Sequence, residues 1–276
     1  MVVVYANGTW LNENDYAIPV DERGHQFGDG VYEVIRVYDG KPFRAKEHWD
    51  RLLMSAKEIR IDFDWSHDTL NALMAEGIDR LGDDNCAVYL QVTRGIAPRG
   101  HLFPVNVEPS VTMTVRPVRM TPKEERYRGK RAIFLPDERW ANCYIKSLNL
   151  LPNILAKQTA IDKGFDEAIL VRDGFVTEGT ASNVYMVKDG QIITTPISRH
   201  ILYGITRKHV EELAARLEIP FVERHFTEKE MLQADEVFYT SSTIEVMPIV
   251  EIDERLIGDG TVGPITDQLI RSFFTK

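Results

Sequence analysis

The stretch Asn142-Cys-Tyr-Ile-Lys-Ser-Leu-Asn-Leu-Leu-Pro-Asn153 contains a single charged residue, Lys146, in an otherwise uncharged run. A lysine beside aromatic and aliphatic side chains is poorly hydrated, and poor hydration favours the neutral, nucleophilic amine that Schiff-base chemistry requires. The alternative is a lysine whose stem packs on the run while its ammonium reaches solvent. Pro152 predicts that a helix begins here, because the missing N–H of proline is harmless in a first turn.

A second stretch, Thr177-Glu-Gly-Thr-Ala-Ser-Asn183, follows a predicted strand and turn. Its first four residues are by themselves a common turn composition. Together, Lys146 and the downstream Glu178 resemble the pyridoxal-phosphate (PLP) transaminases of fold type IV. This family includes D-amino acid transaminases, branched-chain transaminases and aminodeoxychorismate lyases.

The resemblance covers almost the whole chain, from the Asn7-Gly8 turn to Val250-Glu-Ile-Asp253. Within the family it is greatest to the bacterial D-amino acid transaminases. The most specific parts are residues 145–150 and the stretch Arg23-Gly-His-Gln-Phe-Gly-Asp-Gly-Val-Tyr-Glu33. Two residues depart from the pattern: His25 stands where tyrosine is expected, and Pro152 where relatives usually have a small residue.

The composition is that of an ordinary folded protein. A chain of 276 residues with 43% hydrophobic residues can form one large domain or two modest ones. The net charge of −9, without a basic block, argues against nucleic acid and anionic membranes as partners. Cys86 and Cys143 are too few for a disulfide framework, and we expect no metal site. Cys143 is expected to be a buried structural thiol.

The first residues lack the basic region and the apolar run of a signal peptide, and no later stretch approaches membrane-spanning length. We therefore expect a cytoplasmic protein.

Periodicity predicts a small N-terminal α+β domain over residues 1–118. Asn7-Gly8 between two apolar runs predicts a hairpin, because both turn positions need positive φ. Apolar residues at helical spacing predict two amphipathic helices that cover one side of a sheet, the second capped by Ser66. The helices are expected at 46–60 and 70–81, and the strands at 2–5, 9–11, 31–38, 87–93 and 111–118.

Residues 119–130 are polar and contain proline and glycine, so we interpret them as an interdomain linker. Residues 131–276 are expected to form a larger C-terminal domain, with hairpins at Asp173-Gly174 and Asp189-Gly190 and a capping box from Thr227 to Glu230. The resemblance implies that this domain is barrel-like and that the cofactor lies between the two domains.

The resemblance also implies a cofactor site. Lys146 would hold PLP as a Schiff base and then act as the base and acid of the proton shift, while Glu178 would face the pyridine nitrogen. Ile205 and Thr206 open a predicted helix, whose free N–H groups suit a phosphate. The remaining implied contacts are Ser242 and Arg51 to the phosphate and Arg139 near the phenolic oxygen. Judged without the family, Arg51 would be a surface cation.

Tyr32, Arg99 and His101 are the implied substrate-binding residues. A guanidinium fork, an imidazole and a phenol can bind an α-carboxylate through charge-assisted hydrogen bonds. The alternative for Arg99 and His101 is a solvated polar loop. Branched-chain transaminases use a different carboxylate site, and amine transaminases do not need this one.

The function implied by the resemblance is transfer of the amino group from a D-amino acid, such as D-alanine, to a 2-oxo acid, such as 2-oxoglutarate, by a homodimer. Two alternatives remain open. The first is a transaminase for branched-chain L-amino acids or (R)-amines. The second is an aminodeoxychorismate-type lyase, which would retain Lys146 and Glu178 but eliminate pyruvate.

Overall fold

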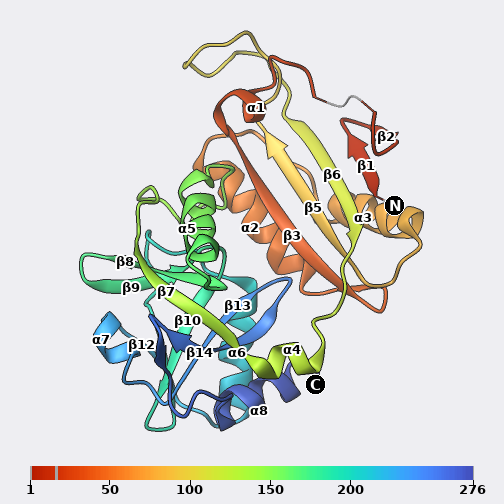
Figure 1. The fold of residues 1–276 in the computed structure, drawn as a ribbon. Helices are drawn as coiled ribbons and strands as arrows, with labels where there is room; N and C mark the ends of the chain where they lie inside the picture. Colours follow the sequence, from red (N-terminus) through yellow and green to blue (C-terminus); the bar gives the residue numbers. More distant parts are fainter. Residues whose placement is uncertain (1, 16–17, 276) are drawn as a thin grey trace. The chain divides into compact units, whose positions relative to one another are not determined.

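The computed structural model describes residues 2–15 and 18–275. Within them the chain divides into two units (Figure 1). The first unit is the chain up to Met120 together with Ile145–Asn149, and the second is Thr121–Tyr144 together with the chain from Leu150. Residues 145–149 were expected in the second domain, 131–276, but they lie in the first unit because they pair with one of its strands.

The first unit is built on an antiparallel sheet of six strands in the order β2-β1-β6-β5-β3-β4. The expected hairpin at Asn7-Gly8 is confirmed, and both turn residues have positive φ. The strands are β1 (Val3–Ala6), β2 (Thr9–Leu11), β3 (Gly30–Tyr38), β4 (Lys41–Pro42), β5 (Cys86–Thr93) and β6 (Ser110–Pro117).

Two long helices pack on this sheet, as the apolar periodicity predicted. Helix α2 (Ala45–Glu58) contacts β3, and α3 (His67–Leu81) contacts β1, β5 and β6; both lie behind the strands in Figure 1. The Ser66 hydroxyl accepts a hydrogen bond from the Thr69 N–H at 3.1 Å, which confirms the predicted cap. Helix α1 (Arg23–Phe27) was not expected, because five residues are too few to show helical periodicity.

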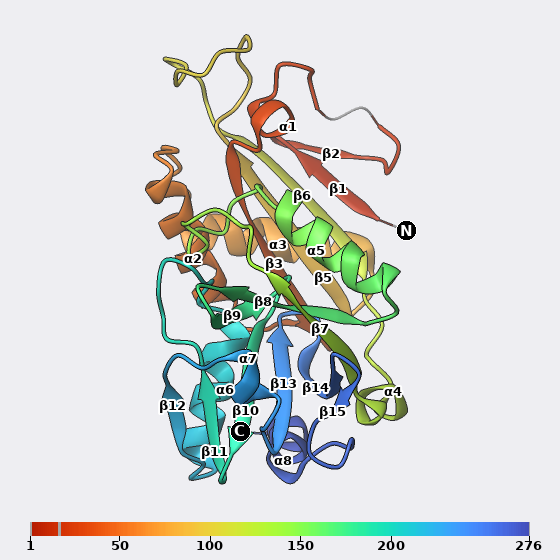
Figure 2. The ribbon, with the colours of Figure 1, turned by 60° about the vertical axis from the view of Figure 1, so that its left-hand side comes forward.

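The second unit contains a nine-stranded mixed sheet in the order β12-β11-β10-β13-β14-β7-β8-β9, with β15 paired to β14. Figure 2 shows β11, β10, β13 and β14 side by side. The sheet curls until β9 contacts β10, which confirms the barrel-like form. The strands are β7 (Lys130–Pro136), β8 (Glu167–Arg172), β9 (Phe175–Gly179), β10 (Asn183–Lys188), β11 (Gln191–Thr194), β12 (Phe221–Glu223), β13 (Glu236–Ser241), β14 (Glu245–Ile252) and β15 (Arg255–Leu256).

Helices α5 (Leu151–Asp162), α6 (Ile205–Arg216), α7 (Glu228–Met231) and α8 (Pro264–Ser272) complete this unit. Helix α5 is the crossover that the parallel strands β7 and β8 require, and Pro152 lies in its first turn as predicted. The capping box between Thr227 and Glu230 is confirmed at α7.

The predicted linker, residues 119–130, contains helix α4 (Lys123–Arg128). Its polar composition reflects acidic residues in the first turn and basic residues in the last, both favoured by the helix dipole. The buried Arg126 donates to the carbonyls of Ile244 and Val246 at 2.7 and 2.6 Å and to the Glu245 carboxylate at 2.8 Å. These bonds fix α4 to the second unit.

None of the helices that the structure describes is both long enough and apolar enough to cross a membrane.

Candidate active site

Lys146 is held through its main chain by the first unit. The Tyr32 N–H donates to the Lys146 carbonyl at 3.1 Å, and the Lys146 N–H donates to the Ser55 hydroxyl at 3.2 Å. The side chain is half-buried, with Nζ 4.3 Å from the centre of the Tyr32 ring. The position of the amine is therefore set by bonds that do not involve the side chain itself.

Gly30 allows residues 145–149 to lie close to β3. Ser147 pairs with Val31, and the Leu148 N–H donates to the Gly30 carbonyl at 3.0 Å, so residues 145–149 cover the edge of β3 that β5 leaves open. A Cβ at Gly30 would lie 2.7 Å from the Val92 carbonyl oxygen and 2.8 Å from Leu148. A larger residue would force the two backbones apart, and Lys146 with them.

Arg51 is only 8% exposed, so the alternative of a surface cation is wrong. Its Nε and Nη2 donate to the two oxygens of Glu33 at 2.6 and 2.9 Å. Glu33 is fully buried on β3 and also accepts from His48 Nδ1 at 2.6 Å. His48 and Arg51 are three residues apart on α2, so they present one face of that helix to the carboxylate.

Charge pairing dominates the electrostatics of this cluster. Burial raises the pKa of Glu33, but the charges of Arg51 and His48 outweigh burial and hold that pKa far below its usual range. Burial lowers the pKa of His48, partly opposed by Glu33. Near neutral pH the lowered pKa values favour a charged Glu33 and a neutral His48.

Acidification is expected to destabilise the protein through Glu33. Because folding lowers the Glu33 pKa, its contribution is complete above the unfolded pKa of about 4.3 and is lost as pH falls towards the folded pKa. His48 adds a loss of the same sign below about pH 6.5. Thermal melting from about pH 7 to about pH 2 should show Glu33→Gln with a lower Tm at neutral pH and a flatter slope below about pH 4.

The matched control for this melting series is Glu76→Gln, which removes an exposed ion pair with Arg80 and should leave the acid slope unchanged. An acid slope in Glu33→Gln as steep as in the parent chain would contradict the assignment.

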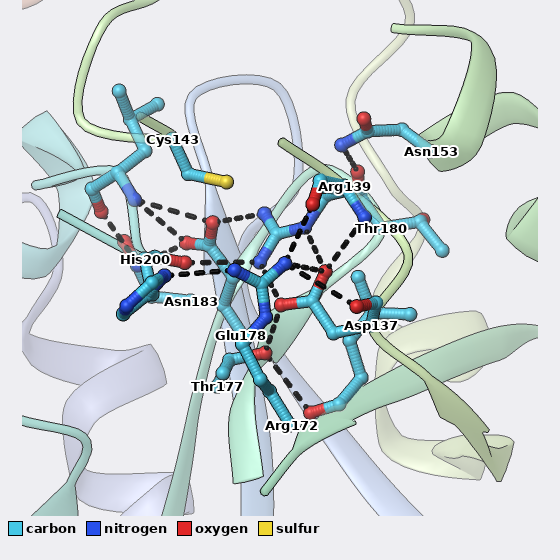
Figure 3. Close-up of polar contacts among 12 residues, drawn as sticks. Asp137, Arg139, Cys143, Asn153, Arg172, Thr177, Glu178, Thr180, Asn183 and His200 are labelled. Atoms are coloured by element: carbon cyan, nitrogen blue, oxygen red, sulfur yellow. Dashed lines mark hydrogen bonds and ion pairs between the residues drawn. The ribbon is translucent and has the colours of Figure 1, made fainter. Parts of the chain in front are cut away.

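Glu178 lies at the centre of a polar network in the second unit (Figure 3). Its carboxylate accepts from Arg139 Nη1, from Asn183 Nδ2 at 3.0 Å and from the Leu202 N–H at 3.1 Å. Arg139 is itself fixed by Asp137, which accepts from its Nε and Nη2 at 2.9 and 2.8 Å. Both oxygens of Glu178 are thus oriented by donors from separate segments.

The network contains two carboxyls in opposite electrostatic situations. Burial raises the pKa of Glu178, against the attraction of Arg139. Burial also raises the pKa of Asp137, but hydrogen bonds from Arg139 outweigh it and lower that pKa. Burial opposes the charge on Arg139, yet Asp137 and Glu178 together raise its pKa. Glu178 is therefore the carboxylate whose burial is less fully compensated within the network, so a cationic partner would stabilise its charge.

The ends of several elements of the second unit meet at Asn183. Its amide donates to Glu178, and in the strand ladder it pairs with Thr240, two residues before Ser242. A Cβ at Gly204 would lie 2.2 Å from the Asn183 Oδ1, so only glycine allows α6 to begin so close. Ser242 lies in the turn between β13 and β14.

Ile205 and Thr206 are buried in the first turn of α6. No side chain caps this helix, and the first N–H groups of a helix have no acceptor within it. Arg207 follows in the same turn and is buried; within the described residues its Nε and Nη1 have no hydrogen-bond partner, while Nη2 donates to Glu223 at 2.6 Å. This turn therefore offers donors and positive charge to an anion.

The three expected substrate-binding residues all belong to the first unit. Arg99 and His101 are exposed on the loop between β5 and β6, and Tyr32 is half-buried on β3. Among the residues described, no hydrogen bond joins either loop residue to Tyr32. His25 is exposed on α1, and its N–H donates to the capping Glu22 carboxylate at 2.7 Å.

Cys143 is buried, as expected for a structural thiol. Its Sγ donates to the Trp140 carbonyl at 3.1 Å, and burial raises the pKa of the thiol to about 11.

The sequence did not single out Glu33, His48, Asp137 or Asn183. The signal for Glu33 was present, because it shares strand parity with the buried Val31 and Ile35 and therefore places a charge on the core side of β3. Asp137 and Asn183 have no such pattern, since their roles depend on contacts with segments distant in the sequence.

Residues 30–252 match a family model described as "Amino-transferase class IV". These residues contain Lys146, Glu178 and the start of α6. The chain belongs to the class IV aminotransferases. This aminotransferase is 45% identical to the D-alanine aminotransferase of Staphylococcus epidermidis over 99% of this chain and 97% of that protein. It is 46% identical to the D-alanine aminotransferase of Bacillus licheniformis, over 95% and 93%.

Solved structures give the same family and fold. The branched-chain amino acid aminotransferase of Escherichia coli matches this aminotransferase with a TM-score of 0.92 at 27% identity, covering 99% of this chain and 93% of that one. The branched-chain amino acid aminotransferase of Thermoproteus uzoniensis, solved with norvaline, matches with a TM-score of 0.88 at 29% identity, covering 98% and 93%. Another branched-chain enzyme of the same fold was solved with pyridoxamine 5′-phosphate and matches with a TM-score of 0.91. The expected fold type IV is confirmed, and the protein is a PLP-dependent aminotransferase.

The residues of this aminotransferase fit PLP. A buried carboxylate with a raised pKa suits the ring nitrogen, and the uncapped first turn of α6 suits a phosphate. The half-buried Lys146 provides an amine for the aldehyde.

Proposed function

We propose that this aminotransferase moves the amino group of a D-amino acid, such as D-alanine, to a 2-oxo acid, such as 2-oxoglutarate. The observation that carries the proposal is the 45% identity to a D-alanine aminotransferase over nearly the whole of both chains. Arg99 and His101, which provide a guanidinium and an imidazole for a carboxylate, support it.

We assign the covalent and proton-transfer roles to Lys146. Its amine would hold the PLP aldehyde and, when free, would take and return the proton at the substrate α-carbon. Bound PLP supplies the electron sink that makes the α-proton acidic. The main-chain bonds from Lys146 to Tyr32 and Ser55 keep the amine in place during this transfer.

Other residues are assigned to hold the ring and the phosphate of the cofactor. Glu178, oriented by Arg139, Asn183 and Leu202, would hold the ring nitrogen, and its negative charge would favour the protonated form of that nitrogen. The N–H groups of Ile205 and Thr206 and the Ser242 hydroxyl bind the phosphate, and Arg51 adds a charge that Glu33 orients. Arg139 acts through Glu178, since its guanidinium is already bonded to two carboxylates.

Tyr32, Arg99 and His101 bind the substrate α-carboxylate in this proposal. Fixing the carboxylate decides which face of the α-carbon Lys146 reaches, and so selects the D series.

We also propose a cytoplasmic homodimer. Leu102 and Val105 are 88% and 80% exposed on the loop that carries His101, and exposed apolar side chains grouped on one loop are typical of protein interfaces.

The first experiment is a half-reaction. The PLP-loaded protein is mixed separately with D-alanine, L-leucine and an (R)-arylethylamine, and conversion of the cofactor to its amine form is followed by absorbance. Rapid conversion with D-alanine alone is the expected result. Conversion mainly with L-leucine would instead favour a branched-chain enzyme like the solved relatives, and conversion mainly with the amine an (R)-amine transaminase. Release of pyruvate without the amine form would indicate a lyase.

Arg99→Ala is expected to raise the KM for D-alanine about 10- to 100-fold, because a charge-assisted bond is lost from substrate binding. The KM for the carboxylate-free amine should stay within about twofold, since that substrate makes no such bond. Steady-state kinetics with both substrates checks this, and Arg80→Ala, an exposed arginine on α3, is the control. Equal effects on the two substrates would remove Arg99 from the carboxylate site.

A further inference from the structure

Helix α1 contacts the loop that carries Arg99 and His101. The buried Arg23 donates through Nη1 to the carbonyl of Gly100, the residue between them, at 2.7 Å. Its main-chain N–H donates to the Gly95 carbonyl at 2.9 Å, near the start of the same loop. A single arginine on α1 therefore fixes the loop at two points.

Phe27, one turn further along α1, contacts both side chains of interest. The Arg99 guanidinium carbon lies 4.4 Å from the centre of the Phe27 ring, which is within cation–π range. The His101 ring meets the same ring edge-on, with centres 5.9 Å apart and planes at 64°. The Phe27 ring thus sets the spacing between the guanidinium and the imidazole.

The charges of this cluster leave Arg99 available for an anion. Asp29 accepts from Arg23 at 2.8 Å and from Arg94 at 2.9 Å, which neutralises two of the nearby guanidinium groups in part. No carboxylate in residues 2–15 and 18–275 pairs with Arg99. Arg94 also lies 3.6 Å from the centre of the Phe103 ring, so the loop is held beyond His101 as well.

We propose that Arg23 and Phe27 are positioning residues that hold Arg99 and His101 in the geometry needed for the substrate carboxylate. This inference rests on the proposed role of Arg99 and His101. Neither α1 residue needs to touch the substrate; both reduce the freedom that the loop would otherwise lose when the carboxylate binds.

Phe27→Leu tests the ring contacts, because leucine retains an apolar side chain without a π face. The KM for D-alanine should rise about fivefold while kcat at saturation is unchanged, since loop order affects substrate binding only. The KM for the (R)-arylethylamine should not change. Phe27→Tyr retains the ring and should restore the KM for D-alanine.

Arg23→Lys tests the bond to the loop. A lysine ammonium cannot copy the fork that serves Asp29 and Gly100 together, so the KM for D-alanine should rise about 10-fold, again with little change in kcat. Arg80→Met is the matched control. Arg80 lies over the Trp10 ring as Arg23 lies over the Phe27 ring, but Arg80 does not contact this loop.

The double variant Phe27→Leu/Arg99→Ala separates the inference from the proposed function. Phe27→Leu should add a smaller loss once Arg99 is absent, because only its contact with His101 then remains. Arg99→Ala without an effect on D-alanine would overturn both the carboxylate site and this inference. If Arg99→Ala raises the KM for D-alanine, three results for Phe27→Leu would overturn the inference alone. These are an unchanged KM for D-alanine, an effect on that KM that is fully additive to the effect of Arg99→Ala, and an equal rise in the KM for the amine. Thermal melting and cofactor absorbance identify any variant that fails to fold.

Discussion

Replacing Lys146 with alanine is expected to lower kcat by a factor of about 10³ or more and to remove the visible absorbance of the bound cofactor. Lys146 is the residue proposed to bond the cofactor aldehyde, so the alanine variant has no amine for that bond. The fold should survive, because the bonds that hold this segment, to Tyr32 and Ser55, come from the main chain. Turnover of D-alanine and an absorbance spectrum of the purified variant check the two parts.

Lys157→Ala is the matched control for this substitution. Lys157 lies on α5, eleven residues after Lys146, and pairs with Glu167 at 3.1 Å. It should retain both the spectrum and the turnover. A Lys146→Ala protein that is active with an unchanged spectrum would remove the central assignment of the proposal.

Glu178→Gln is expected to lower kcat about 10²- to 10³-fold with a much smaller change in KM. Glutamine retains the shape of the side chain but not the charge, and an electrostatic partner of the reacting system typically contributes an effect of this size. The amide oxygen could still accept from Arg139 and Leu202, whereas the amide nitrogen would face the Asn183 donor and lose that bond. Steady-state kinetics with D-alanine, beside a cofactor titration, separates lost chemistry from lost cofactor.

Glu236→Gln controls for the loss of a buried carboxylate in the same unit. Glu236 accepts from the N–H groups of Ile265 and Thr266 at the start of α8, so its loss should lower the Tm and spare kcat. A kcat for Glu178→Gln no lower than that of Glu236→Gln would mean that the Glu178 charge plays no part in the reaction.

Local signals in the sequence predicted much of the fold. The Asn7-Gly8 hairpin, the Ser66 cap, the first turn at Pro152 and the capping box at Thr227 each depend on a few adjacent residues, and all are present in the structure. Helix α1 was too short to produce a period, and α4 was hidden because its polar residues also suit a linker.

Contacts between distant residues limited prediction of the site. The resemblance indicated Arg51, Arg139 and Glu178. It did not indicate that Arg51 pairs with Glu33 or that Arg139 pairs with Glu178. Those pairs join a helix to a strand, and a loop to a strand end, across separations that no local pattern encodes.

Ser147 pairs with Val31, so residues 145–149 belong to the first unit although they follow part of the second unit in the sequence. An exchange of the first unit between members of this family cannot stop at Met120, because the five residues Ile145–Asn149 fold with that unit. A chimera with a single junction would join the edge of β3 from one parent to a lysine-bearing segment from the other. A transfer of this chain's first unit therefore needs three junctions, and the inserted segment carries Lys146 with it.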